Sequence, residues 1–317
     1  MGPISDKNTY LKHLTTIQLG IADSVPAHKK LSLELLIKIP KSFLPRLITV
    51  LIVAPLALIA ILYLTRELRL WTWLFVIYCF IFFAILWEWC DVARIKAVWA
   101  KCVYAGLFIL AAVVLTYVEV NHDDLIIPYV EVILDDLIVG AALVVWTFGI
   151  VAVLFFKSLR RVLSNRALLL PAGGIVAVGS ILAFSKIDAS GKALIAIIAV
   201  AGVTDSFAYL IGNFFGTRQL HPDVSPSKTW EGTIGGFVGG LSCLFVFDQV
   251  LGWIEFHTFW LWPVAVLYAI FGDLFESALK RTADMKDSGN LLPGHGGFLD
   301  RFDSLMALSV CAYFCVV

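Results

Sequence analysis

The sequence predicts an all-α polytopic membrane protein with about nine transmembrane helices and a cytoplasmic N-terminus. Of its 317 residues, 60% are hydrophobic and only 15% are charged, and the mean hydropathy is +0.89. Soluble domains are less apolar, at about half of their residues. Basic and acidic residues balance at 24 each, so the composition gives no indication of a nucleic-acid partner.

Apolar runs close to the length of a membrane span recur nine times along the chain. A hydrocarbon core of about 30 Å requires roughly 20 residues per helix. The runs are 43–64, 70–89, 98–118, 137–156, 168–184, 192–214, 233–251, 259–277 and 302–317. We expect 1–42 to be a cytoplasmic or interfacial segment, 43–191 to hold helices one to five, and 192–317 to hold helices six to nine.

The charges in the loops predict the orientation of these helices. Lys and Arg gather in the N-terminal segment and in two later loops, near 94–101 and 157–166. The segment 119–136 between those two loops carries six carboxylates and no Lys or Arg. Because basic loops stay in the cytoplasm, this pattern favours an N-terminus inside. The polar loops 215–231 and 278–301 then also face the cytoplasm.

Five glycines near the start of the seventh run predict close helix packing. Gly232, Gly236 and Gly240 share one face of a helix, and Gly235 and Gly239 lie beside them. Small residues at this spacing let two helix backbones approach each other. We expect packing inside the bundle, and a contact between two copies in a homodimer is the alternative.

The sixth run carries a polar stripe at helical spacing, formed by Asp205, Tyr209 and Asn213. At 1.5 Å per residue, Asp205 lies about 15 Å inside the cytoplasmic end of its helix. A carboxylate at that depth must be paired, protonated or bound to a metal. A ligand-binding role is one interpretation, and a structural hydrogen-bond anchor is the other.

The loop after this helix combines hydroxyl groups with a lysine. Ser225, Ser227 and Thr229 offer hydroxyl donors, and Lys228 is a mobile cation suited to phosphate oxygens. The loop leads into the N-terminus of the next helix, where free amides favour anions. The alternative is that Lys228 serves only membrane topology.

A second cluster of charges follows the eighth run. Asp273, Glu276 and Lys280 share a helix face, and Glu276 with Lys280 could form a structural pair. Next come a turn rich in glycine around His295 and two carboxylates three positions apart, Asp300 and Asp303. Carboxylates beside lysines and glycine-exposed amides suit Mg²⁺ and phosphate. The same residues could instead form an ion pathway in a transporter.

The segment 277–303 reads SALKRTADMKDSGNLLPGHGGFLDRFD and closely resembles the signature of the CDP-diglyceride synthetases, the phosphatidate cytidylyltransferases. The loop SPSKTWEG at 225–232 resembles a second element of that family, and Trp87-Glu88-Trp89 resembles a third. The chain departs from the family pattern at 205–209, where it has Asp-Ser-Phe-Ala-Tyr in place of the commoner Asp-Thr-Gly-Ala-Tyr.

This resemblance implies the reaction of CTP with phosphatidate drawn from the bilayer, giving CDP-diacylglycerol and diphosphate. It makes 192–317 the catalytic region and implies Mg²⁺, in a site that can take a second cation. It also implies a multi-pass protein of the cell inner membrane with an active site facing the cytoplasm. The implied catalytic residues are Lys228, Asp273 and Asp300. The implied metal ligands are Asp273, Asp300 and Asp303. The implied substrate-binding residues are Ser225, Ser227, Thr229, Lys280, Arg281, His295 and Asp205.

Two alternatives to this activity are a CTP-dependent polyprenol or phytol kinase and a secondary transporter. A kinase would transfer the γ-phosphoryl group of CTP to an alcohol, and a transporter would move substrate without CTP turnover. The Pro-Gly-His-Gly-Gly segment at 293–297 with Asp300, Arg301 and Asp303 argues against the kinase.

Overall fold

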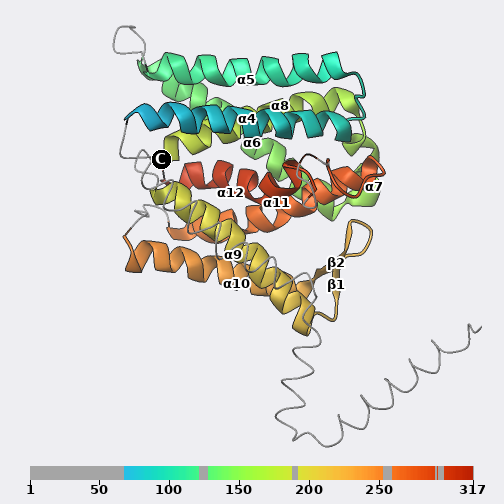
Figure 1. Cartoon of the computed structure of the whole chain (residues 1–317). Coiled ribbons are helices and arrows are strands. Elements are labelled where there is room, and N and C mark those ends of the chain that lie inside the picture. Colours follow the sequence, from blue (N-terminus) through green and yellow to red (C-terminus); the bar gives the residue numbers. More distant parts are fainter. Residues whose placement is uncertain are drawn as a thin grey trace, which may run out of the picture. The chain divides into compact units, whose positions relative to one another are not determined.

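The structure is a computed structural model, and it describes residues 68–120, 128–187, 192–252, 259–289, 291 and 296–316 (Figure 1). The expected N-terminal segment, the first predicted helix and His295 lie outside these residues.

Eight long helices occupy eight of the nine predicted runs. They are α4 (Leu68–Val92), α5 (Val98–Val120), α6 (Pro128–Leu154), α8 (Arg166–Ile187), α9 (Lys192–Phe215), α10 (Trp230–Phe245), α11 (Trp262–Thr282) and α12 (Leu299–Val316). Six described segments are long and apolar enough to cross a membrane: Val98–Thr116, Ile133–Leu154, Arg166–Ile187, Lys192–Phe215, Trp230–Val250 and Trp262–Thr282. The described part of the chain thus has the architecture of a polytopic membrane protein.

The structure differs from the expected elements at four places. Helix α6 begins at Pro128, so the second half of the acidic segment 119–136 is helical rather than a loop. The basic loop contains a short helix, α7 (Phe156–Leu163). A π-helical turn, η2 (Val246–Val250), extends α10, and a 3₁₀ turn, η3 (Phe259–Leu261), precedes α11.

The fourth difference is a β-hairpin in the loop 215–231, so the prediction of an all-α fold is wrong there. Strands β1 (Gln219–His221) and β2 (Ser225–Thr229) pair antiparallel. The turn between them is closed by the Val224 amide, which donates to the His221 carbonyl at 3.2 Å. The Val224 side chain is fully buried. Burial of this apolar side chain holds the otherwise polar loop in one conformation.

Helix α12 lies in the middle of the bundle. It packs against α11, α8 and α6, and it also contacts α9 and α4 (Figure 1). Every residue from Asp303 to Tyr313 is buried. Buried polar groups at its N-terminal end are therefore surrounded by protein, which is where ionisable residues in a membrane helix are tolerated.

The glycine faces of α10 pack on α9, which confirms the expected packing inside the bundle. A Cβ atom on Gly232 would lie 2.6 Å from the Ala208 carbonyl oxygen, and one on Gly236 would lie 2.8 Å from the Ala208 Cβ. Side chains at these positions would force the two helices apart. Since α10 follows the hairpin directly, this packing fixes the hairpin against the end of α9.

The loops predicted to be cytoplasmic gather at one end of the bundle. The Arg94 guanidinium donates to the Thr282 carbonyl at 2.5 Å, and Lys157 forms an ion pair with Asp223 at 3.3 Å. Figure 1 shows α7 and the hairpin at this end. The opposite end holds a second group of polar contacts, among them an ion pair between Lys186 and Asp135 at 2.9 Å.

Candidate active site

A contact between the hairpin and α11 is the centre of the candidate site. Strand β2 presents Lys228, whose Nζ lies 2.5 Å from Oδ2 of Asp273. Both side chains are about one-quarter to one-third exposed, at 27% and 30%. The loop 215–231 thus meets the helix that leads into the loop 278–301. Two predicted catalytic residues lie in contact and remain open to a ligand.

Asp273 belongs to a cluster of three carboxylates with Glu276 and Asp303. One carboxylate oxygen from each residue lies within 4.8 Å of the others. Glu276 and Asp303 are only 2% and 5% exposed. Three carboxylates this close repel one another, and burial strengthens the repulsion. Nearby positive charge would relieve this repulsion.

Lys280 supplies part of that charge and joins the cluster to α12. Its Nζ lies 2.5 Å from Oε2 of Glu276 and 2.7 Å from Oδ1 of Asp300. Asp300 also accepts hydrogen bonds from the amides of Ser288, at 3.1 and 3.2 Å, and Gly297, at 2.9 Å. Burial raises the pKa of Asp300, but the bonds from Lys280 and the Gly297 amide outweigh it and hold the pKa below its ordinary value.

Asp303 differs from its two neighbours because no described ion pair involves it. Its Oδ1 accepts a hydrogen bond from the Ser304 amide at 2.7 Å. Hard cations such as Mg²⁺ are bound by oxygen ligands, commonly by one or two carboxylates. The donor set of Asp273, Glu276 and Asp303 fits such a cation, and a cation would also relieve the repulsion between them.

The remaining predicted residues fall into three groups. Asp205 lies on α9, a helix that contacts both β2, which carries Lys228, and α11, which carries Asp273. Thr229 and Arg281 hold the backbone: Thr229 Oγ1 accepts the Gly232 amide at 3.1 Å, and Arg281 Nε donates to the Val224 carbonyl at 3.1 Å. Ser225 is half-buried and Ser227 is exposed, both on the same strand as Lys228.

Comparison with known proteins decides the family. The model of a family described as the cytidylyltransferase family matches residues 44–317. This chain belongs to the cytidylyltransferase family. It is 46% identical to a phosphatidate cytidylyltransferase of Bacillus subtilis over 114 residues, which are 35% of this chain and 42% of the relative. It is 47% identical to one of Thermotoga maritima over 120 residues, 35% of this chain and 44% of the relative.

A third relative gives the same extent of similarity. The chain is 43% identical to a phosphatidate cytidylyltransferase of Haemophilus influenzae over 120 residues, 36% of this chain and 42% of the relative. The chain thus matches less than half of the length of each of these relatives. That this chain has their activity is therefore a proposal, which is argued below from the geometry of the site.

Two carboxylates have contacts that the sequence did not predict. The sequence predicts Glu276 as a partner of Lys280 and not as one of the metal ligands, yet its side chain lies in the carboxylate cluster. Glu88 was noticed only within the Trp-Glu-Trp element, yet it contacts the loop that leads to Asp300. For Glu88 the available signal was a charged residue within an otherwise apolar run.

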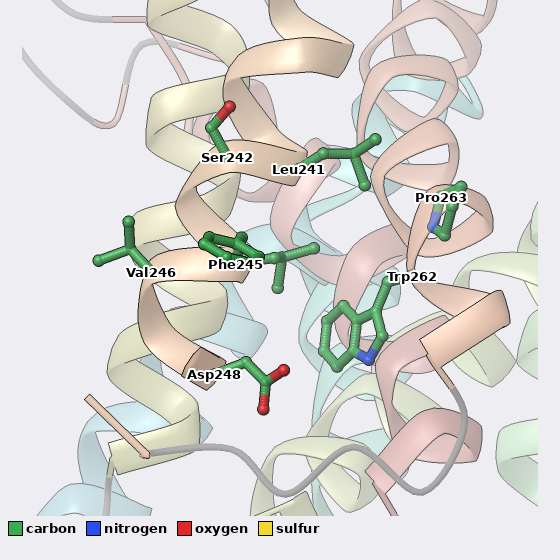
Figure 2. A pocket seen from close by; sticks show the side chains of 8 residues that line it. Leu241, Ser242, Phe245, Val246, Asp248, Trp262 and Pro263 are labelled. Atoms are coloured by element: carbon green, nitrogen blue, oxygen red, sulfur yellow. The ribbon is translucent and has the colours of Figure 1, made fainter. Parts of the chain in front are cut away.

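A groove in the described part of the chain lies away from this site. It has a volume of about 470 Å³ and is open between α10 with η2 and the start of α11 (Figure 2). The side chains around it are mostly apolar. They are Leu241, Ser242, Leu244, Phe245, Val246, Asp248, Trp262 and Pro263. None of the predicted site residues lines it, so it is not the reaction site.

Proposed function

We propose that this cytidylyltransferase-family protein converts CTP and phosphatidate into CDP-diacylglycerol and diphosphate. The contact between Lys228 and Asp273 carries the proposal, because it joins the loop SPSKTWEG at 225–232 to the helix that leads into the segment 277–303. The matches to three proteins of that name support the same activity. The convergence of cations and carboxylates suits substrates with many phosphate oxygens.

Mg²⁺ is the proposed cofactor, in a site that can take a second cation. Asp273, Glu276 and Asp303 would hold it, since their oxygens converge and Asp303 has no partner in a described ion pair. Asp300 remains a proposed ligand from the resemblance, although in the structure Lys280 and two amides occupy its oxygens. When bound, Mg²⁺ would neutralise phosphate charge and orient the reacting groups.

In the proposed reaction, a phosphate oxygen of phosphatidate forms a bond with the α-phosphorus of CTP. The bond from that phosphorus to the oxygen bridging to the β-phosphate breaks, and diphosphate leaves with the electron pair. Lys228 would neutralise charge on the CTP phosphates, and Lys280 would keep Glu276 and Asp300 in place. The nucleophile is already ionised at neutral pH, so the site needs positioning and charge neutralisation more than a base.

Labelled CTP tests this function directly. Purified protein with phosphatidate, Mg²⁺ and α-³²P CTP is expected to produce labelled lipid, whereas γ-³²P CTP should yield only labelled diphosphate. A CTP-dependent lipid kinase would give the reverse distribution. A transporter would consume no CTP at all. Either result would refute the proposed reaction.

We further propose that the protein is a multi-pass protein of the cell inner membrane with this site in the cytoplasm. The basic loops near 94–101 and 157–166 support this orientation, because they lie at the same end of the bundle as Lys228. CTP is a cytoplasmic substrate, which also favours it. A homodimer remains a prediction. The glycine faces of α10 pack on α9 within the chain, so they give it no support as a contact between two copies.

Labelling of single cysteines tests the orientation. In a background in which the six native cysteines are replaced, a cysteine at position 121 is expected to react with an impermeant thiol reagent added outside intact cells. A cysteine at Lys286, whose side chain is exposed, should react only after the cells are opened. The opposite pattern would show that the site faces outward.

A further inference from the structure

The side chain of Glu88 connects α4 to the loop on which Asp300 depends. Glu88 is 1% exposed, and its Oε2 accepts two hydrogen bonds. One comes from the Ser288 hydroxyl and the other from the Leu299 amide, each at 2.9 Å. These donors lie 200 and 211 positions further along the chain. Burying a carboxylate in a membrane protein costs desolvation free energy, and such residues commonly have a functional role.

Both donor residues are directly linked to Asp300, Ser288 by hydrogen bonds and Leu299 by the peptide bond. The Ser288 amide donates to both carboxylate oxygens of Asp300, at 3.2 and 3.1 Å. Leu299 precedes Asp300 directly and is 1% exposed. Glu88 therefore holds Leu299, which precedes Asp300, and Ser288, which binds the Asp300 carboxylate. Glu88 itself lies outside the ion pairs of Lys228 and Lys280 described above.

Two glycines make room for the Glu88 carboxylate. A Cβ atom on Gly289 would overlap the Glu88 carboxylate, at 2.7 Å from its Cδ and 2.9 Å from its Cγ, and its three nearest atoms all belong to Glu88. A Cβ atom on Gly297 would overlap the same carboxylate and the Ser288 hydroxyl. The loop backbone thus closes around Glu88.

We propose that Glu88 is a positioning residue that orients Asp300 through Ser288 and Leu299. It acts as a hydrogen-bond acceptor at Oε2. The other oxygen, Oε1, has no hydrogen-bond partner among the described residues. An amide nitrogen in the place of Oε1 would leave both hydrogen bonds at Oε2 intact, so a glutamine at position 88 should keep the positioning role. The effect on turnover rests on the proposed function, whereas the coupling of Glu88 to Asp300 does not.

The activity experiment compares Glu88→Ala, Glu88→Gln, Gly289→Ala and the double variant Glu88→Ala/Gly289→Ala. Displacing a positioned group by about 1 Å can lower turnover about a hundredfold. We expect Glu88→Ala and Gly289→Ala each to lower kcat by about that factor with little change in KM. Glu88→Gln should retain most of kcat. The double variant should be no slower than Glu88→Ala, because removing Glu88 creates the space that a Cβ at 289 needs.

The matched control is Asp91→Ala, three positions further along α4, where the carboxylate pairs with Lys101. It should keep kcat near the wild-type value. The inference is wrong if Glu88→Ala keeps kcat within about threefold of wild type, if the losses of Glu88→Ala and Gly289→Ala multiply, or if Asp91→Ala is equally slow. Should Glu88→Ala fail to fold, Glu88→Gln and Gly289→Ala still decide between these outcomes.

A second experiment needs no substrate. Thermal unfolding in detergent is measured for Glu88→Ala, Asp300→Asn and the double variant of both. The control is the same set of measurements with Asp91→Ala in place of Glu88→Ala. Glu88 and Asp300 should be coupled, so that the shifts in the unfolding midpoint are not additive, whereas Asp91 and Asp300 should be additive. Additive shifts for Glu88 and Asp300 would overturn the inference. Intact coupling without CTP turnover would overturn only the proposed function.

Discussion

Replacing Lys228 with alanine is expected to lower turnover about a hundredfold. The Nζ of Lys228 lies 2.5 Å from Asp273, and the side chain is 27% exposed, so the ammonium can also reach phosphate oxygens. Losing one preorganised charge of this kind typically costs on the order of 3 kcal/mol of transition-state stabilisation. The measurement is kcat of purified protein with CTP and phosphatidate. Added Mg²⁺ should not restore the rate, because Lys228 lies on β2 whereas the proposed metal ligands lie on α11 and α12.

Two further variants separate this role from a general effect of positive charge. Lys228→Arg should recover only part of kcat, because a planar guanidinium does not replace a compact ammonium. Lys157→Ala is the matched control, since Lys157 is a basic residue at the same end of the bundle whose side chain is 83% exposed. It should retain full turnover. If Lys228→Ala in correctly inserted protein is as active as Lys157→Ala, Lys228 serves only membrane topology.

Replacing Asp303 with asparagine should lower turnover strongly while leaving the bundle folded. Asp303 is 5% exposed and shares the carboxylate cluster with Asp273 and Glu276. Asparagine keeps the size of the side chain but removes the charge that a cation would neutralise. We expect a loss of a hundredfold to about a thousandfold in kcat. Without Mg²⁺ the variant should be at least as stable as wild type, because one of three repelling charges is gone.

Thermal unfolding with and without Mg²⁺ checks this assignment independently of turnover. A cation that binds only the folded protein raises the unfolding midpoint, so Mg²⁺ should stabilise wild type but not Asp303→Asn. Asp136→Asn is the matched control, because Asp136 accepts a hydrogen bond from Tyr313 at the opposite end of α12. It should keep the response to Mg²⁺. An unchanged response in Asp303→Asn would remove Asp303 from the proposed metal site.

The apolar runs predicted the helices well, because a membrane span is specified by length and hydropathy along the chain. Helix α8 (Arg166–Ile187), for example, extends the predicted run 168–184 by only two or three residues at each end. The hairpin was not predicted, because its conformation depends on the burial of Val224 against the bundle. Local composition around Lys228 indicated only a polar loop.

The candidate site was predictable as a set of residue types but not as a set of contacts. The resemblance indicated Lys228, Asp273 and Asp300, and the structure pairs Lys228 with Asp273 while Lys280 contacts Asp300. That division depends on how α11 and α12 face each other, which no spacing within one helix determines. Glu88 was harder to assign, since its partners lie more than 190 positions away in sequence.

The central place of α12 has a consequence for biosynthesis. The ribosome makes this helix after every other described element, yet it carries Asp300 and Asp303 and fills the middle of the bundle. A nascent chain that has not reached Leu299 presents Lys228, Asp273 and Glu276 without the carboxylates that complete the site. The proposed site is therefore complete only after Leu299–Val316 has been synthesised and has packed among the helices that precede it.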